Sequence, residues 1–535
     1  MQSLSQLYYL HGIGYEYTKY TGEHVIFDES TRMQALSCCG VDTQDTDAIN
    51  QLNFALDAGT WLNLLPHTSI IEAHHPILKV RVDERLLSRS CTLSVPSLDI
   101  HFTCENLQGL AILGDYGLNG IRYLELALPV PEMPIGYHDA LITVADQQSH
   151  SQLWITPKES FSIDDKKRLG LSIQLYSLCN EEGLGIGDFA DLTKLIKAAA
   201  TKNMDYVLLN PLHLLFEHSP ERASPYSPNS RALLNPLYIA VSLCEDAKNN
   251  NALIKLLADK PQTDATYIDY TSVSDFKYQV FSCLYQHFCE FGSAERKQLF
   301  TRFCETHKHS LSTMLVGDRD YASYLQWQAH LQLNICQQAA RDSGMAIGLI
   351  NDLAVGCAGD GSEFKSQNEL FAENAHVGAP PDPWAEHGQN WGLPALNPQK
   401  LSKDNFAFYR SLIRANMEDV GGLRIDHVMA IRRLWWCFEN ISQQDGCYVY
   451  YPFEQLLAIL KIESHLNQCV VIGEDLGVVP NEVREALKAS AIYSNGLFYF
   501  EKDHQGEFLA AEHFAPHSLL TVSYTHLRAH ETGRN

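Results

Sequence analysis

Basic residues are scarce in this sequence. Its 535 residues include 40 Lys and Arg against 64 Asp and Glu, which gives a formal net charge of −24. Proteins that bind nucleic acid or an anionic membrane need patches of positive charge to contact phosphate groups. We therefore expect neither nucleic acid nor a membrane as a partner, and neutral or cationic small molecules fit the composition better.

Signatures of metal sites, nucleotide sites and export are also missing. The 23 histidines form no HExxH pattern, the 14 cysteines form no CxxC pair, and no GxxxxGK[ST] loop accompanies the glycine-rich stretch 181–187. No N-terminal signal and no apolar run of about 18 residues is present. We expect a cytoplasmic protein with reduced cysteines, whose reaction uses no metal and no organic cofactor.

The first part of the chain is predicted to contain a small β domain. Residues 1–60 hold short mixed segments and end in a helix-like run at 48–59. In residues 61–160 apolar and polar residues alternate, as in ILKVRVDERL (77–86), and Asn119 with Gly120 supplies a tight turn. This pattern indicates a β-sandwich-like domain. It could bind carbohydrate, although a packing or dimerisation module is the favoured interpretation.

Residues 169–522 are predicted to form an α/β domain in which strands alternate with helices. The first strand-like run, 169–178, is followed by Asp188, which can cap a helix, and the last two runs are LFYF (497–500) and LLTV (519–522). Seven such strands favour a (β/α)8 barrel with its site at the carboxyl ends of the strands. We interpret the helical span at about 243–315 as an inserted subdomain.

Two acidic residues follow successive strands of this predicted barrel. Asp426 lies in the run GGLRIDHV (421–428), two residues after Arg424 and directly after the strand-like part, and Glu474 holds the matching place in CVVIGED (469–475). Arg424 should keep Asp426 anionic, whereas Glu474 has no Arg or Lys for several residues on either side and suits an acid and base role. Such a pair fits retaining glycoside cleavage, although two ion-paired rim residues remain an alternative. His427 is interpreted as bracing the site or binding a polar substrate, rather than a metal.

Five stretches in the same order closely resemble the 4-α-glucanotransferase family, also called amylomaltases or disproportionating enzymes, in its bacterial form with an N-terminal extension. They are LYSLCNEEGLGIGDFADL (175–192), NPLHLLFEHSPERASPYSPNSR (210–231), VGAPPDPWAEHGQNWGLP (377–394), IRANMEDVGGLRIDHVM (413–429) and VVIGEDLGVVP (470–480). The resemblance implies transfer of α-1,4-glucan segments between maltodextrins by a double displacement, with glucose or maltose as acceptor.

The same resemblance implies roles for individual residues. Asp426 would be the nucleophile, Glu474 the general acid and base, and Arg424 the group that orients Asp426. The remaining positions would contact sugar: Ser224, Tyr226, Asp382, Gln389 and Trp391. An aromatic ring suits the apolar face of glucose, and amides and carboxylates suit its hydroxyl groups.

The end of the sequence departs from the family pattern. The family carries a THDLPT-like motif whose Asp is a third catalytic carboxylate, whereas this chain has Thr525, His526 and then Leu527. We expect residues 524–535 to be a non-native tail, the barrel to be incomplete at its C-terminus, and activity to be impaired. The alternatives to a transferase are an α-1,4-glucan hydrolase and a non-catalytic glucan-binding protein.

Overall fold

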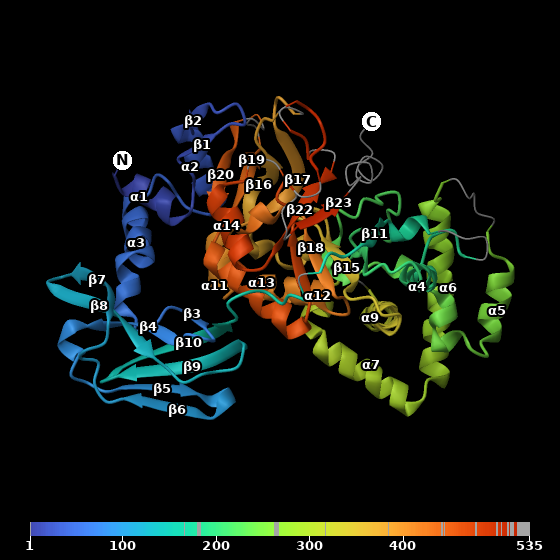
Figure 1. The fold of residues 1–535 in the computed structure, drawn as a ribbon, viewed down its shortest axis with the longest axis horizontal. Helices are drawn as coiled ribbons and strands as arrows, with labels where there is room; N and C mark the ends of the chain where they lie inside the picture. Colours follow the sequence, from blue (N-terminus) through green and yellow to red (C-terminus); the bar gives the residue numbers. More distant parts are fainter. Residues whose placement is uncertain are drawn as a thin grey trace. The chain divides into compact units, whose positions relative to one another are not determined.

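The computed structural model describes residues 2–521, apart from 165, 179–182, 262–266, 316, 383–384, 440–441, 443–444, 477–478, 499–500, 504, 511–512 and 514–517. The described chain divides into two compact units (Figure 1). The described residues of the first unit fall within 2–161, 369–409 and 429–466, and those of the second within 162–368, 410–428 and 467–521. The first unit thus includes two segments from the range 169–522.

The N-terminal part of the first unit contains two β-sheets. The five-stranded sheet has the order β3 (Thr68–Glu72), β10 (Gln147–Thr156), β9 (Gly136–Val144), β5 (Cys91–Val95) and β6 (Ile100–Cys104). The three-stranded sheet has the order β4 (Ile77–Asp83), β8 (Ile121–Pro129) and β7 (Ile112–Leu118). Every pairing is antiparallel except that of β10 with β3.

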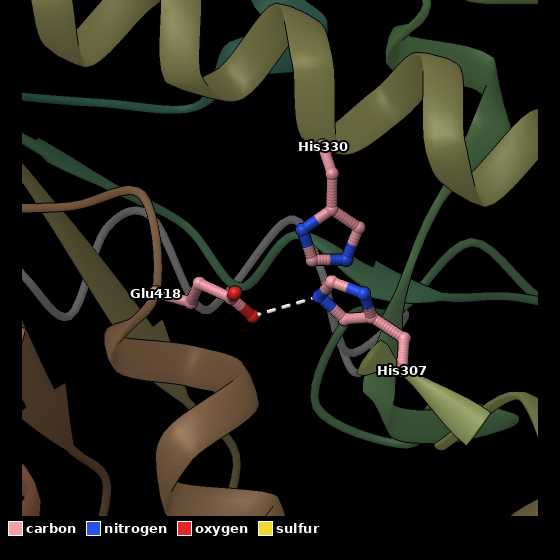
Figure 2. A group of neighbouring side chains, drawn as sticks. All are labelled: His307, His330 and Glu418. Carbon is pink, nitrogen blue, oxygen red and sulfur yellow. Dashed lines mark hydrogen bonds and ion pairs between the residues drawn. The ribbon is translucent and has the colours of Figure 1, made fainter. Parts of the chain in front are cut away.

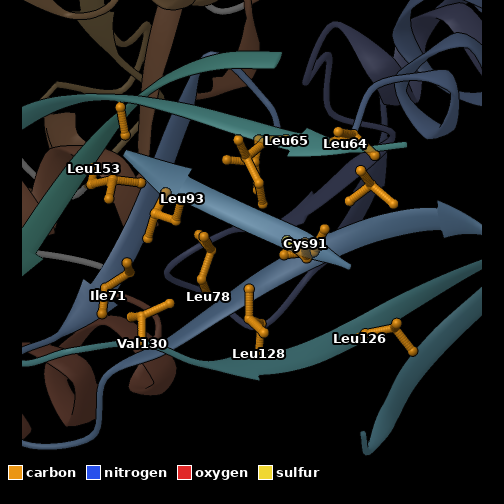
Figure 3. Close-up of a cluster of buried hydrophobic side chains, with 14 of the residues drawn as sticks. Leu64, Leu65, Ile71, Leu78, Cys91, Leu93, Leu126, Leu128, Val130 and Leu153 are labelled. Atoms are coloured by element: carbon orange, nitrogen blue, oxygen red, sulfur yellow. The ribbon is translucent and has the colours of Figure 1, made fainter. Parts of the chain in front are cut away.

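One apolar core joins these two sheets. Figure 3 shows Leu93 and Leu153 of the larger sheet with Leu78 and Leu128 of the smaller sheet in the same cluster. Alternate residues of a strand point to the same face, so most of these strands offer one apolar face to this core, whereas β7 contributes no buried residue to it. Asn119 and Gly120 form the two-residue turn between β7 and β8, both with positive φ (52° and 76°), as a hairpin of this length requires.

The first unit also holds a four-stranded antiparallel sheet that the sequence reading missed. Its order is β17 (Gln389–Leu396), β16 (Phe371–Ala379), β19 (Arg433–Phe438) and β20 (Cys447–Tyr450). The remaining elements of this unit are α1 (Gln2–Leu10), β1 (Glu16–Thr18), β2 (His24–Ile26), α2 (Glu29–Cys38), α3 (Thr46–Leu56), α11 (Pro398–Lys403) and nearly all of α13 (Phe453–Asn467). The predicted helix at 48–59 corresponds to α3.

The second unit is built on a parallel sheet of seven strands. In spatial order they are β11 (Gly170–Ile173), β12 (Tyr206–Leu209), β15 (Gly348–Leu353), β18 (Gly422–Ile425), β21 (Val470–Gly473), β22 (Tyr493–Leu497) and β23 (Ser518–Thr521). Spatial order equals chain order, as in a (β/α) barrel. Of the predicted strand LFYF (497–500), Leu497 is the last residue of β22, which is formed by the less apolar run YSNGL and pairs with β21 and β23, while 499–500 lie outside the described residues.

This parallel sheet curves around its own interior. Leu208 of β12, Ile350 of β15 and Ile472 of β21 pack in one cluster, together with Leu519 of β23. Strands that are not neighbours in the sheet therefore share a core, which a flat sheet would prevent.

Helices follow the strands of the second unit. They are α4 (Phe189–Ala200), α5 (Asn251–Ala258), α6 (Tyr270–Phe291), α7 (Ala294–Thr306), α8 (Lys308–Ser312), α9 (Arg319–Asp342), α10 (Ser362–Ser366) and α14 (Asn481–Ala489), with a short hairpin of β13 (His213–Leu214) and β14 (Ser230–Leu234). Helix α12 (Ala407–Met417) leads into β18. Asp188 forms a capping box with Asp191 at α4, which confirms its predicted role.

None of the helices in the described ranges has both the length and the apolar character that spanning a bilayer would require. The thirteen cysteines within those ranges are all free thiols.

Candidate active site

Asp426 and Glu474 follow neighbouring parallel strands of the second unit. Ile425 of β18 pairs with Gly473 of β21, so the next residue of each strand occupies the same level of the sheet. The Glu474 amide donates to the Ile425 carbonyl at 2.9 Å, which extends the pairing to these positions. Because parallel strands lie about 4.8 Å apart, the two acidic residues leave the sheet side by side at its carboxyl edge.

The backbone of the turn after β18 holds the Glu474 carboxylate. Its Oε2 accepts the His427 amide at 2.9 Å, and its Oε1 accepts the Leu476 amide at 3.0 Å. His427 has a φ of 48°, a left-handed conformation that is uncommon outside glycine. In this conformation the His427 backbone amide points toward Glu474.

Arg424 contacts three residues at the same edge. Its guanidinium is completely buried, and it donates to Asp352 at 2.5 Å and to the Asn495 side-chain oxygen at 2.9 Å. Its two contacts with Asp426 are longer, at 3.4 Å each. The expected pairing of Arg424 with Asp426 is thus present, but the shorter ion pair is with Asp352.

Asp352 is the penultimate residue of β15 and was missed in the sequence reading. It is 1% exposed, and its second oxygen accepts the Tyr226 hydroxyl at 2.8 Å. Burial raises the pKa of the Asp352 carboxyl above its usual range, while the charge of Arg424 opposes this shift. The sequence contains a signal for Asp352, because the apolar run GLIND ends in an acidic residue, as the runs GLRID and VVIGE do.

The predicted sugar-contacting residues divide between the two units. Ser224 and Tyr226 belong to the second unit, where both are partly exposed in the segment between β13 and β14. Asp382, Gln389 and Trp391 belong to the first unit, in the hairpin of β16 and β17.

Two of these first-unit residues are joined by a hydrogen bond, from Trp391 Nε1 to Gln389 Oε1 at 3.1 Å. Asp382 Oδ1 accepts the Ala385 amide at 2.7 Å, which stabilises the loop before β17. Trp391 is partly exposed, so part of its ring can contact a ligand. Thr525, His526, Leu527 and the tail 524–535 lie outside the described residues.

The carboxylates of Asp426 and Glu474 can divide a reaction between them. Asp426 lies beside a fixed cation and can serve as a nucleophile, whereas Glu474 can exchange a proton with a leaving or entering oxygen. Within the described ranges, one group of side chains could hold a metal ion, His307, His330 and Glu418. Glu418 precedes β18 and Asp426 follows it, so this group is at the opposite end of that strand.

Comparisons with known proteins show the family of this chain. Residues 173–316 and 315–526 match the Glyco_hydro_77 family model, described as 4-alpha-glucanotransferase. The 4-alpha-glucanotransferase of Haemophilus influenzae is 34% identical over 454 residues, which cover 74% of this chain and 64% of that protein. The enzyme of Mycobacterium tuberculosis is 28% identical over 575 residues, which cover 97% of this chain and 79% of that protein. The chain thus spans less than two thirds of the Haemophilus relative.

Solved structures indicate the same family. The amylomaltase of Corynebacterium glutamicum superposes with a TM-score of 0.84 at 27% identity, over 98% of this chain and 79% of that one. The amylomaltase of Streptococcus agalactiae has the same fold at 18% identity, with a TM-score of 0.57 over 66% of this chain and 78% of that one. The family match, the relatives and the fold together show that this chain belongs to the 4-alpha-glucanotransferase family.

Proposed function

We propose that this chain is a 4-α-glucanotransferase that moves segments of α-1,4-glucan from one maltodextrin to another. The observation that carries the proposal is the placement of Asp426 and Glu474 at matching ends of adjacent parallel strands in a member of this family. The parallel sheet is proposed to be part of a (β/α)8 barrel, whose reactions occur at the carboxyl ends of the strands.

The proposed reaction is a double displacement. Asp426 attacks the anomeric carbon, Glu474 protonates the departing glycosidic oxygen, and a glucosyl ester forms on Asp426. Glu474, now ionised, then takes the proton of an incoming 4-hydroxyl group. That oxygen attacks the same carbon and releases Asp426, so the anomeric configuration is retained.

The residues around the carboxylates position them for these steps. Arg424 orients Asp426 and is itself fixed by Asp352 and Asn495. Backbone amides fix both oxygens of Glu474. A preorganised set of charges needs little rearrangement when charge develops at the sugar.

Sugar contacts are proposed for both units. In the second unit they involve Ser224, Tyr226 and His427, and in the first unit Asp382, Gln389 and Trp391. Glucose and maltose are proposed as acceptors. The N-terminal β domain, 61–160, is proposed as a packing module, and the catalytic reaction is assigned to 169–522.

Incubation with maltotriose tests the activity. A transferase yields glucose together with maltodextrins longer than maltotriose, whereas a hydrolase yields only shorter products. Glucan binding without any turnover would instead favour a non-catalytic binding protein. Because Leu527 stands where the family motif has an acidic residue, a low rate is expected, and the Asp426→Asn variant provides the background.

A further inference from the structure

Three side chains from separate helical segments of the second unit meet in one cluster. His307 lies between α7 and α8, His330 lies in α9, and Glu418 directly follows α12. Figure 2 shows the two rings and the carboxylate turned toward one another, and their ligating atoms all lie within 4.8 Å of each other. The closest pair is His307 Nε2 and Glu418 Oε2, at 3.0 Å.

Each imidazole has one nitrogen already held by a neighbour. His307 Nδ1 contacts the Phe303 carbonyl oxygen at 3.0 Å. His330 Nδ1 faces Asp419 Oδ2 at 3.4 Å, while Asp419 Oδ1 accepts the Asn334 amide at 2.7 Å. Protein metal sites use such outer partners to fix the histidine tautomer, so that the second ring nitrogen can bind the ion.

The surroundings favour a cation at this point. Glu418 and Asp419 lie at the carboxyl end of α12, where the helix dipole opposes negative charge. Asp419 also has a φ of 62°, the left-handed region that a non-glycine residue occupies only at a cost. A positive partner would therefore stabilise both carboxylates at this helix end.

Partial burial of these side chains would strengthen the binding of a cation and still let the cation reach them from solvent. The side chains of His307 and His330 are 16% and 10% exposed, and the Phe303 ring stacks on His307 with centroids 4.1 Å apart. The Glu418 side chain is 34% exposed, so solvent reaches the cluster from that side.

We propose that His307, His330 and Glu418 form a binding site for a divalent transition-metal ion, with Zn²⁺ as the best match. Two imidazoles and a carboxylate are a donor set that Zn²⁺ prefers, whereas Mg²⁺ and Ca²⁺ prefer oxygen ligands alone. Bonds of about 2.0–2.1 Å to a tetrahedral ion hold ligand atoms about 3.3 Å apart, so a small movement of side chains completes the site. Water supplies the fourth ligand, and Asp419 remains the outer partner of His330.

The location indicates a structural role for this ion. It would tie α7, α8 and α9 to the segment that enters β18, while Asp426 lies at the other end of that strand. Features at the amino ends of barrel strands serve stability rather than chemistry. The sequence concealed the site because His330 follows His307 by 23 residues and Glu418 follows a further 88 residues later.

Metal titration of the whole, chelator-treated chain tests the proposal. Isothermal titration with Zn²⁺ should show one site, and Co²⁺ should give the absorption bands of a tetrahedral ion without the charge-transfer band of a thiolate ligand, which separates this site from the cysteines. His330→Gln should weaken Zn²⁺ binding at least tenfold, and Asp419→Asn should weaken it by about 10–100-fold through the outer partner.

His309→Gln is the matched control, because His309 is exposed in α8 only two residues from His307. It should bind Zn²⁺ as the unchanged chain does, and Zn²⁺ should raise the Tm of both but not of His330→Gln. Equal Zn²⁺ affinity in the His330→Gln and His309→Gln variants would overturn the proposal. So would a site that binds Mg²⁺ as tightly as Zn²⁺, or a Co²⁺ spectrum dominated by thiolate.

Discussion

Two arginines are buried in the second unit, and their surroundings differ. Arg231 and Glu363 form a pair in which Nε and Nη2 donate to one carboxylate oxygen, at 3.0 and 2.6 Å, while the Arg231 amide donates to the other at 2.7 Å. The remaining nitrogen, Nη1, donates to the Ala354 and Val355 carbonyls. Every part of this guanidinium thus has a partner that belongs to the framework.

Arg424 is shared rather than paired. It contacts Asp352 closely, Asn495 at an ordinary distance and Asp426 at 3.4 Å. Because the closest contact of Arg424 is to Asp352, Asp426 lies near a positive charge. The oxygens of Asp426 are not held in a tight ion pair with it. The comparison suggests that the Arg231–Glu363 pair stabilises the fold, whereas Arg424 serves the reaction. Substitutions at the first pair should therefore reduce stability, and substitutions around Arg424 should reduce activity.

Asp426→Asn should give the largest effect, on activity alone. The amide cannot form the glucosyl ester, so turnover should fall by roughly a thousandfold or more. Stability should change little, because Arg424 keeps its contacts with Asp352 and Asn495. Glucose release from maltotriose and the urea midpoint are the two measurements. Retention of more than a few per cent of the activity would contradict the nucleophile assignment.

Glu474→Gln should lower activity by roughly 10²–10⁴-fold, because proton transfer to the leaving oxygen is lost. The amide oxygen can still accept one of the two backbone amides, so folding should be largely preserved. Donors with good leaving groups need less protonation and should recover part of the first step. If such donors show no recovery relative to maltotriose, Glu474 is not the acid.

Arg231→Met should reverse the pattern by reducing stability. It leaves Glu363 buried with its charge uncompensated, which costs about 3–5 kcal/mol. Chemical denaturation measures the loss, and the rate per folded molecule should remain near that of the unchanged chain. A double variant, Arg231→Met with Glu363→Leu, should regain stability because no buried charge remains. A rate loss that exceeds the unfolded fraction would mean that this pair also shapes the site.

The sequence predicted the parts of this comparison that depend on local patterns. The strand ends that carry Asp426 and Glu474 follow from apolar runs that stop at an acidic residue, and the Asp188 cap follows from residue type. The partners of Arg424 do not follow in this way, because Asp352 and Asn495 come from strands that are 72 and 71 residues away in the chain. The sheet of β16, β17, β19 and β20 was missed for a similar reason, since the pairing of β16 with β19 joins two distant segments of the first unit.

Lys277 extends the comparison to a third buried cation. It lies in α6 and donates to the Leu237 and Ile239 carbonyls at 2.7 and 2.9 Å. Burial lowers the pKa of Lys277 to about 8, although Asp188 opposes the shift. Between about pH 8 and pH 10.5, Lys277 is deprotonated in the folded chain but still protonated in the unfolded chain, where its pKa is the usual 10.5. The unfolded chain therefore binds more protons, and the free energy of unfolding should rise with pH across this window.

The gain attributed to Lys277 should be about 1.5 kcal/mol between about pH 8 and about pH 9.5. Buried cysteines give the opposite slope, so the measurement is the difference between the unchanged chain and Lys277→Met in urea denaturation at several pH values. A difference that does not change with pH would show that Lys277 stays protonated, held by its two carbonyls as firmly as Arg231 is held by Glu363.

Tyr226→Phe should give the smallest effect. It tests the hydrogen bond from Tyr226 to Asp352, the partner of Arg424. It removes the hydroxyl donor from Asp352 and keeps the aromatic ring, so the expected loss of stability is about 1 kcal/mol. Activity should fall only severalfold, because Arg424 still holds Asp352. Tyr226→Ala should in addition raise the KM for maltotriose if the ring stacks on sugar. If both variants show the same KM, Tyr226 does not contact the substrate. It then acts only through its hydrogen bond to Asp352, which in turn holds Arg424.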